Sequence, residues 1–175
     1  MPAVINRLFG SALLLFAVFG SGYARTSELS SQSAGEPVGE PVGEPAGARI
    51  ARDVAYVSRP DGDLLADVHI PAGTGPFAAV ITIHGGSWRT GWRWEMNAIA
   101  RLLTARNIVV MNVTYRLVPA HHWPDQYDDV QAAVRWLRAN AAAYRVDPTR
   151  IGAWGYSAGA QLALLLAAQI GRAHV

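Results

Sequence analysis

The 175-residue sequence lacks both cysteine and lysine, and each absence removes whole classes of chemistry. Without cysteine there is no disulfide, no thiolate zinc site, no iron–sulfur cluster and no cysteine nucleophile. Since all fifteen basic residues are arginine, the sequence also excludes a Walker-type phosphate lysine, a Schiff-base lysine and a serine–lysine dyad. Serine, histidine and carboxylate chemistry remain.

The charge of the chain is small and evenly spread. The formal net charge is +2, with 16% charged and 51% hydrophobic residues, which is the composition of an ordinary globular domain. No run of arginines has the pattern of a nucleic-acid-binding segment, and no group of histidines and carboxylates has metal-ligand spacing. We therefore expect no nucleic-acid partner, no metal and no cofactor. The oligomeric state is not indicated by the sequence.

The first 24 residues have the pattern of an export signal. Arg7 precedes an almost continuous apolar stretch, Leu8 to Phe19, and Gly22-Tyr23-Ala24 has the small residues of a cleavage site. A buried core helix and a membrane anchor are the alternatives, but a membrane-spanning helix needs about 20 apolar residues and this stretch is shorter. We predict a signal peptide over residues 1–24, export to the periplasm or secretion, and no stable membrane span.

Residues 25–48 differ sharply in composition from the rest of the chain. A serine-rich stretch leads into three copies of a Gly-Glu-Pro repeat, at 35–37, 39–41 and 43–45. Proline at every fourth position removes backbone donors, and glycine and glutamate favour a solvated chain with nothing to bury. We predict a disordered linker over residues 25–48 that holds the domain at a distance.

Residues 49–175 alternate short apolar runs with helical patterns. Two β-like runs flank the turn sequence Pro60-Asp61-Gly62, which predicts a hairpin. The predicted strands are Arg52–Ser58, Leu64–Ile70, Ala78–Ile83, Ile108–Val113 and Ile151–Tyr156, and the predicted helices are Trp94–Arg106, Asp125–Ala143 and Ala158–Ile170. Strand and helix in alternation predict an α/β fold whose mostly parallel sheet has helices on both faces.

The sharpest functional signal is Gly155-Tyr156-Ser157-Ala158-Gly159. It follows a predicted strand and opens a predicted helix, which is the setting of a nucleophile elbow. Such a turn exposes the Ser157 hydroxyl at the carboxyl edge of the sheet, and it directs the Ala158 amide and the helix N-terminus at developing negative charge. The pattern predicts that Ser157 is a catalytic nucleophile. The alternative is an ordinary glycine-rich turn.

A second signal, His84-Gly85-Gly86-Ser87-Trp88, directly follows the strand that ends at Ile83. Adjacent glycines let the backbone turn amides toward an oxyanion. We therefore predict an oxyanion hole formed by Gly85, Gly86 and Ala158. For His84 we favour a packed residue that shapes the loop over a catalytic base.

With both motifs in this order, the chain resembles the α/β-hydrolase superfamily, and more narrowly the hormone-sensitive-lipase-like esterases and the bifunctional deacetylase/feruloyl-esterase type. The likeness extends from about residue 50 to 170. Its further stretches are Asn112–Leu117, Pro119–Pro124, Asp128-Asp129-Val130, Ala133–Leu137 and Asp147–Ile151. The resemblance implies that Ser157 attacks an acyl carbonyl while the amides of Gly85, Gly86 and Ala158 hold the oxyanion.

The same resemblance implies an acid and then a histidine after the serine. Residues 158–175 contain no acid, and their one histidine, His174, lies roughly 25 Å from Ser157 along a continuous helix of about 1.5 Å per residue. His121 and His122 match a family loop of mainly structural role. His69 lies in a strand far from the elbow. Asp128 and Asp129 fit a helix start, and the alternative is that they orient a base. We expect a fragment without the triad acid and histidine. A natural short product is the alternative.

The expected substrate is an ester. Trp88, Trp123 and Tyr156 are candidates for a substrate pocket, with Trp92 and Trp94 nearby in sequence, although tryptophan also fills cores. The export signal and the resemblance favour a small-molecule or carbohydrate ester. The rival hypothesis from another class is a catalytically inactive, exported binding module that uses the tryptophan-rich mouth without turnover.

Overall fold

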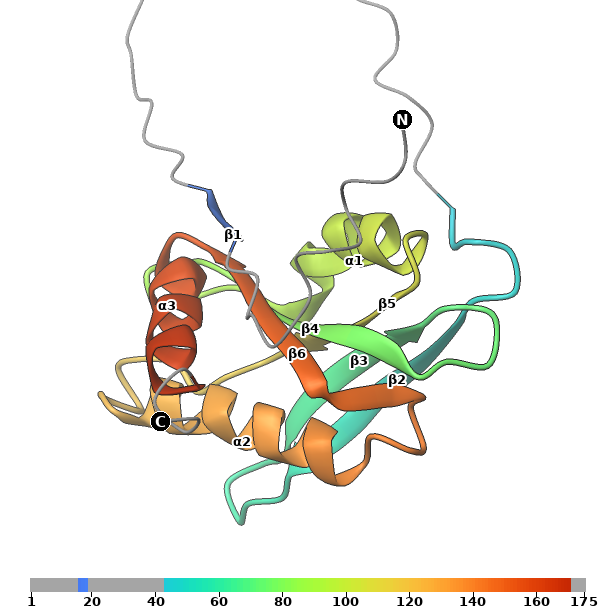
Figure 1. The fold of residues 1–175 in the computed structure, drawn as a ribbon. Coiled ribbons are helices and arrows are strands. Elements are labelled where there is room, and N and C mark those ends of the chain that lie inside the picture. The colour runs from blue at the N-terminus through green and yellow to red at the C-terminus, as the bar shows by residue number, and fades with distance from the viewer. Residues whose placement is uncertain (1–15, 19–42, 171–175) are drawn as a thin grey trace, which may run out of the picture.

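The computed structural model describes residues 16–18 and 43–170, in which a six-stranded sheet carries helices on both faces (Figure 1). The strands are β1 (Phe16–Val18), β2 (Arg49–Val57), β3 (Leu64–Ile70), β4 (Phe77–Ile83), β5 (Ile108–Val113) and β6 (Val146–Tyr156). The helices are a 3₁₀ turn (Arg93–Met96), α1 (Asn97–Thr104), α2 (Asp125–Ala139) and α3 (Ala158–Ile170).

The strand order across the sheet is β1-β6-β4-β5-β3-β2. The pairs β1/β6, β6/β4 and β4/β5 are parallel, whereas β5/β3 and the hairpin β3/β2 are antiparallel. Parallel strands covered on both faces need apolar side chains on both faces, which is why β4 and β5 read as continuous apolar runs. The predicted α/β class and the predicted hairpin are confirmed.

Alternate residues of the central strands face two different layers. Ile81 and Ile83 of β4 belong to the same buried core as Leu137 of α2 and Leu162 of α3. On the opposite face, α1 packs against β5 and β3, and Figure 1 shows it apart from the α2 and α3 layer. The period-two alternation of a strand produces this division. The parallel pairing of β4 and β6 brings their carboxyl ends side by side at one edge of the sheet.

The predicted helix 94–106 is an α-helix only over Asn97–Thr104, and a 3₁₀ turn precedes it. The chain first forms the 3₁₀ turn, in which the Glu95 side chain accepts a hydrogen bond from the Trp92 amide at 3.0 Å. The helix ends before Asn107, whose φ of +60° is left-handed. On α1, Leu102 is 46% exposed, whereas Ala100 is buried.

Two further predicted boundaries are wrong. Helix α2 ends at Ala139 and not at 143, because the Asn140 side chain donates to the Trp136 carbonyl at 2.8 Å and caps the last turn. Strand β6 begins at Val146, before the predicted turn 147–150. That turn survives as a bulge, since Phe77 and Ala79 of β4 pair with Val146 and Ile151, and Asp147 accepts the Thr149 amide at 2.9 Å.

Most of the predicted signal peptide and linker lies outside the described residues. Within residues 1–24, only Phe16–Val18 are described, as a short strand parallel to the end of β6. Of residues 25–48, the structure describes 43–48. No helix within residues 16–18 and 43–170 is long and apolar enough to cross a bilayer.

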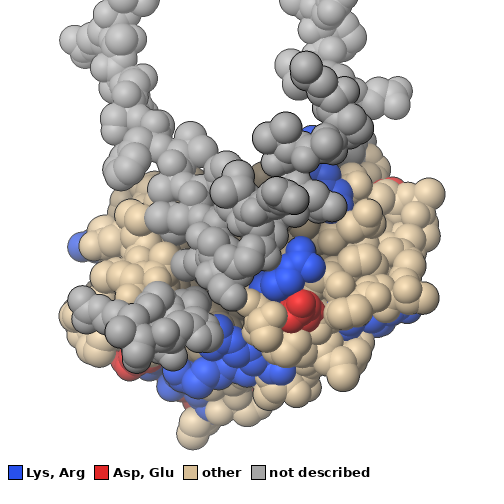
Figure 2. All heavy atoms as spheres, in the orientation of Figure 1, with Lys and Arg blue, Asp and Glu red and all other residues tan. Residues whose placement is uncertain are grey.

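Among the residues that the structure describes, the arginines on the face shown in Figure 2 do not form one continuous positive patch. Figure 2 shows arginines in separate groups over the described part of this face, with aspartate and glutamate among them. This arrangement agrees with the small net charge of +2.

Candidate functional site

Ser157 lies where the sheet edge passes into a helix. Strand β6 ends at Tyr156 and α3 begins at Ala158, so Ser157 alone forms the turn between them, with a left-handed φ of +52°. Its side chain is exposed, and its carbonyl accepts the amides of Ala160 at 3.0 Å and Gln161 at 3.3 Å. Ser157 therefore occupies the helix N-cap, and the Ala158 amide is one of the helix donors without an intrahelical acceptor.

The glycines of the motif are required by close approach. A Cβ added to Gly159 would lie 2.1 Å from the Ile83 carbonyl oxygen and 2.5 Å from that of His84. At Gly155 it would lie 2.3 Å from the Gly159 carbonyl oxygen. The start of α3 is thus pressed against the end of β4, and this contact brings the serine motif beside the glycine loop.

The loop after β4 is held in an uncommon backbone shape. Gly86, Ser87 and Trp88 have consecutive positive φ values of +104°, +53° and +59°. The Gly86 carbonyl accepts the Arg89 and Thr90 amides at 3.0 and 3.1 Å, which closes a tight turn. Two non-glycine residues in this region store backbone strain, and such strain concentrates at functional sites. The carbonyl of Gly86 is directed into the loop.

His84 is a packed residue, as the sequence predicts. It is 1% exposed and stacks on Tyr115 with ring centroids 4.3 Å apart, and its Nδ1 lies 2.8 Å from the Gly85 carbonyl oxygen. The Tyr115 hydroxyl donates to the His84 carbonyl at 3.0 Å. Burial lowers the pKa of His84 below its ordinary value. The ring packs against the glycine loop through its contact with the Gly85 carbonyl.

Tyr156 joins the elbow to the segment after the glycine loop. Its hydroxyl donates to Glu95 Oε2 at 2.8 Å. A Cβ on Gly85 would lie 2.6 Å from the Tyr156 ring, so the ring rests directly on this glycine. Burial, followed by the hydrogen bond and negative charge of Glu95, raises the pKa of the Tyr156 hydroxyl. The contact ties the two predicted motifs together.

An open, mainly apolar hollow of about 530 Å³ lies beside this region. It is lined by Ser87, Trp88, Arg89, Val118, Trp123, Gln126 and Gln161. Two of the three predicted pocket residues, Trp88 and Trp123, are in this lining, and Tyr156 is not. Gln161 lies one turn after Ser157 on α3, which puts the hollow next to the elbow. Trp92 and Trp94 are exposed and lie outside its lining.

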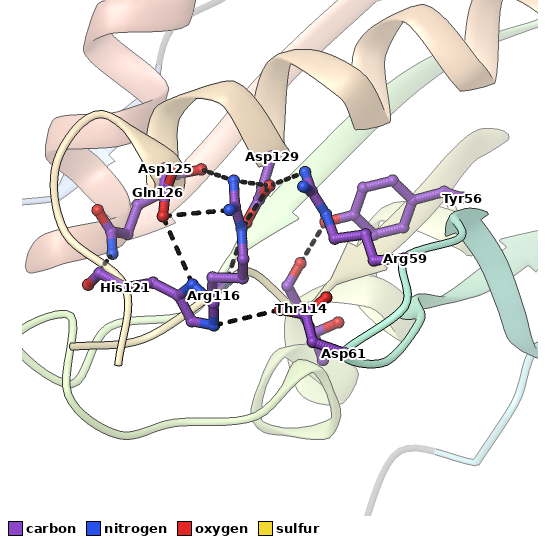
Figure 3. Close-up of polar contacts among 9 residues, drawn as sticks. All are labelled: Tyr56, Arg59, Asp61, Thr114, Arg116, His121, Asp125, Gln126 and Asp129. Atoms are coloured by element: carbon purple, nitrogen blue, oxygen red, sulfur yellow. Dashed lines mark hydrogen bonds and ion pairs between the residues drawn. The ribbon is translucent and has the colours of Figure 1, made fainter. Parts of the chain in front are cut away.

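A buried ion cluster lies beside the loop between β5 and α2 (Figure 3). Asp129 on α2 is fully buried and accepts hydrogen bonds from the guanidinium groups of Arg59 and Arg116, each at 2.9 Å, and from the Arg116 amide at 2.9 Å. Arg116 also pairs with Asp125 at 3.1 Å. The cluster anchors both ends of the loop between β5 and α2, which carries Val118 and Trp123.

The role of Asp129 was missed by reasoning from the sequence, which offered a helix-start carboxylate or a group that orients a base. No sequence spacing signals its partners, because Arg59 lies 70 residues away in the hairpin turn. Asp128, its neighbour, is exposed.

The histidines that were candidates for a catalytic base either contact other residues or lie away from Ser157. His121 pairs with Asp125 at 3.5 Å and Asp61 at 3.8 Å, and His122 is exposed. His69 is buried on the α1 side of the sheet, and His174 lies outside the described residues. Within residues 43–170, no side chain hydrogen-bonds to the Ser157 hydroxyl, and no three histidines or carboxylates gather as a metal site would require.

Comparison with known proteins places this geometry in a family. A family model described as BD-FAE matches residues 66–174. Over 93 residues the chain is 40% identical to arylacetamide deacetylase of Bos taurus, covering 50% of this chain and 23% of that protein. Over 89 residues it is 38% identical to carboxylesterase NlhH of Mycobacterium tuberculosis, covering 50% and 28%.

Solved structures agree with this placement. A thermophilic esterase from Thermogutta terrifontis superposes with a TM-score of 0.61 at 29% identity, over 67% of this chain and 43% of that one. The chain spans about a quarter of the length of the two curated relatives and less than half of this solved one. The range matched by the family model, residues 66–174, contains both the Ser157 elbow and the His84-Gly85-Gly86 loop.

Proposed function

The chain belongs to the BD-FAE family of the α/β-hydrolase superfamily, and from this premise we propose that it carries the nucleophile and the oxyanion-binding groups of a serine carboxylic-ester hydrolase. The observation that carries the proposal is the left-handed, exposed Ser157 at the N-terminus of α3, where Gly159 packs against the carbonyls of Ile83 and His84. Relatives named carboxylesterase and esterase support the same reaction class.

In the proposed reaction, Ser157 Oγ attacks the acyl carbonyl carbon and the carbonyl oxygen becomes an oxyanion. Backbone amides and a helix N-terminus aimed at that oxygen lower the barrier, and a single such donor is worth about 3 kcal/mol. The amides of Gly85, Gly86 and Ala158 are the proposed donors. Collapse of the intermediate expels the alcohol and leaves an acyl-Ser157 ester, which water then hydrolyses.

A base must take the proton of Ser157 for the attack to be fast at neutral pH. We assign no described residue to this role, because the His121 and His69 rings pair with other carboxylates and His84 is packed beneath the glycine loop. The proposal therefore concerns the nucleophile and the oxyanion-binding groups.

The proposed acyl or alcohol site is the hollow lined by Trp88 and Trp123. Flat aromatic walls bind apolar acyl groups and sugar rings. Export of the protein, proposed on the basis of the apolar stretch Leu8 to Phe19 and the small residues after it, would bring this hollow to small-molecule or carbohydrate esters outside the cytoplasm. Those esters are the proposed substrates.

A fluorophosphonate probe tests the proposal, and the relative from Thermogutta terrifontis is described as phosphorylated by paraoxon, an agent of related chemistry. The whole chain is incubated with the probe and its intact mass is measured. We expect one adduct that disappears in Ser157→Ala and persists in Ser87→Ala, the matched control from the exposed glycine loop. No adduct on folded protein would refute the proposal.

A second candidate is ester binding without turnover, favoured by the absence of a side-chain partner for the Ser157 hydroxyl within residues 43–170. In that case Ser157 is not labelled, yet ligands still enter the hollow. Quenching of tryptophan fluorescence by an aryl ester, lost in Trp123→Ala, together with no labelling of Ser157, would select this candidate.

A further inference from the structure

The last Gly-Glu-Pro repeat contacts the folded domain through its glutamate. Glu44 Oε1 accepts a hydrogen bond from Arg101 Nε of α1 at 3.0 Å, and Glu44 Oε2 lies 3.6 Å from Nδ1 of His69 on β3. The Glu44 and Arg101 side chains are each 30% exposed, whereas that of His69 is 1% exposed. One carboxylate therefore bridges a surface guanidinium and a buried imidazole.

The buried side-chain amide of Asn112 determines which ring nitrogen of His69 carries the proton. The Thr82 hydroxyl donates to Asn112 Oδ1 at 2.5 Å, which leaves Asn112 Nδ2 to donate to Asn97 Oδ1 at 3.0 Å and to His69 Nε2 at 3.3 Å. Since Nε2 of His69 accepts, the proton of the neutral ring is on Nδ1. Among the described residues, Nδ1 has no hydrogen-bond acceptor, and the carboxylate of Glu44 is the group it faces.

A buried donor without an acceptor is costly. The Nδ1 proton of His69 and the guanidinium of Arg101 therefore both favour a carboxylate between them. Burial lowers the pKa of His69, and the charge of Glu44 opposes that change. The other charged groups that act on this ring, Asp67 and Arg52, belong to the domain and stay constant whatever occupies the site.

We propose that Arg101 and His69 form a carboxylate-binding site for a Gly-Glu-Pro segment, and that the three repeats are interchangeable occupants of it. The triplets at 35–37, 39–41 and 43–45 have identical sequences, and the site contacts the glutamate that all three share. Gly43 has open space around it, with nothing within 4 Å of an added Cβ, so the chain can enter the site without a close fit at the flanking residue.

The lengths of intervening chain permit the exchange. Glu44 is five positions before Arg49, where β2 begins, and Glu40 is nine positions before it. The probability that a flexible loop closes falls with about the 3/2 power of its length, so binding through Glu40 is roughly 2- to 3-fold weaker than through Glu44. The site is thus an anchor that can set the free length of the linker in steps of one repeat.

The test follows the pKa of the His69 imidazole by NMR in the full chain, in the wild type and three variants. Glu44→Gln removes the observed ligand, Glu36→Gln with Glu40→Gln removes the other two, and the triple variant removes all three. We expect the wild-type pKa in the double variant, a value close to it in Glu44→Gln because Glu40 replaces Glu44, and a clear fall only in the triple variant.

Two results would overturn the proposal. A pKa in Glu44→Gln as low as in the triple variant would mean that Glu44 is the sole ligand and that the repeats do not exchange. An unchanged pKa in the triple variant would mean that no glutamate of the repeats occupies the site. The amide spectrum checks the fold in each case. Neither result bears on the labelling of Ser157.

Discussion

Replacing Asp129 by asparagine tests the claim that its buried charge stabilises the loop between β5 and α2, which carries Val118 and Trp123 of the hollow. The substitution keeps the size of the side chain and removes one negative charge from between two guanidinium groups. In the native protein both carboxylate oxygens accept from Arg116, and Oδ1 also accepts from Arg59. In the variant the amide NH₂ faces these donors and cannot accept from them.

Breaking a buried ion pair by removing one partner costs about 3–5 kcal/mol, because the remaining charge stays buried without compensation. Here Asp129 is fully buried, while the Arg59 and Arg116 side chains are 28% and 14% exposed. The arginines can recover part of their hydration, so we expect the low end, a loss of about 3 kcal/mol in the free energy of unfolding.

Urea denaturation measures this loss as a shift in midpoint at constant slope. Asp128→Asn is the matched control, since it makes the same charge change one residue away at an exposed position, and it should stay within about 0.5 kcal/mol of the wild type. If Asp129→Asn is as stable as Asp128→Asn, the cluster does not anchor the loop and the reasoning fails.

Three further predictions concern the site itself. Gly159→Ala should lower stability by about 3 kcal/mol or prevent folding, since its Cβ meets backbone 2.1 Å away, whereas Gly43→Ala, with open space around it, should leave the urea midpoint unchanged. Tyr156→Phe removes the hydrogen bond to Glu95 and should cost about 0.5 kcal/mol and slow probe labelling; an unchanged labelling rate would argue against a positioning role. Burial lowers the pKa of His84, so the unfolded chain binds more protons than the folded one. The free energy of unfolding should therefore be highest above about pH 6.5 and fall as the pH drops below it. The fall in the free energy of unfolding with pH should be smaller in His84→Gln.

The order of strands and helices was predictable because local patterns determine it. The apolar runs in β4 and β5 and the helical spacing of Val130, Val134 and Leu137 each act within one element. The structure buries these three helix residues and most of the two strands. Which residues of α1 pack inward could not be judged this way. Which side of α1 meets β5 depends on the Trp92–Glu95 turn before it, and that turn has no periodic signature.

For the site, the sequence locates the motifs but not the contacts that connect them. The glycines around Ser157 mark a tight turn in any sequence. In contrast, the contact of Gly159 with the end of β4, the bond from Tyr156 to Glu95 and the cluster at Asp129 join segments far apart in the chain. Such contacts depend on the three-dimensional arrangement, and a pattern within one stretch of sequence does not indicate them.

The most direct test of the proposed function is to trap the acyl-enzyme. The whole chain is mixed with p-nitrophenyl acetate, quenched in acid within the first turnover, and digested for peptide mapping by mass spectrometry. We expect a single acetyl group on Ser157 that is absent from Ser157→Ala. An unmodified Ser157, or acetylation that persists unchanged in Ser157→Ala, would contradict the proposed function.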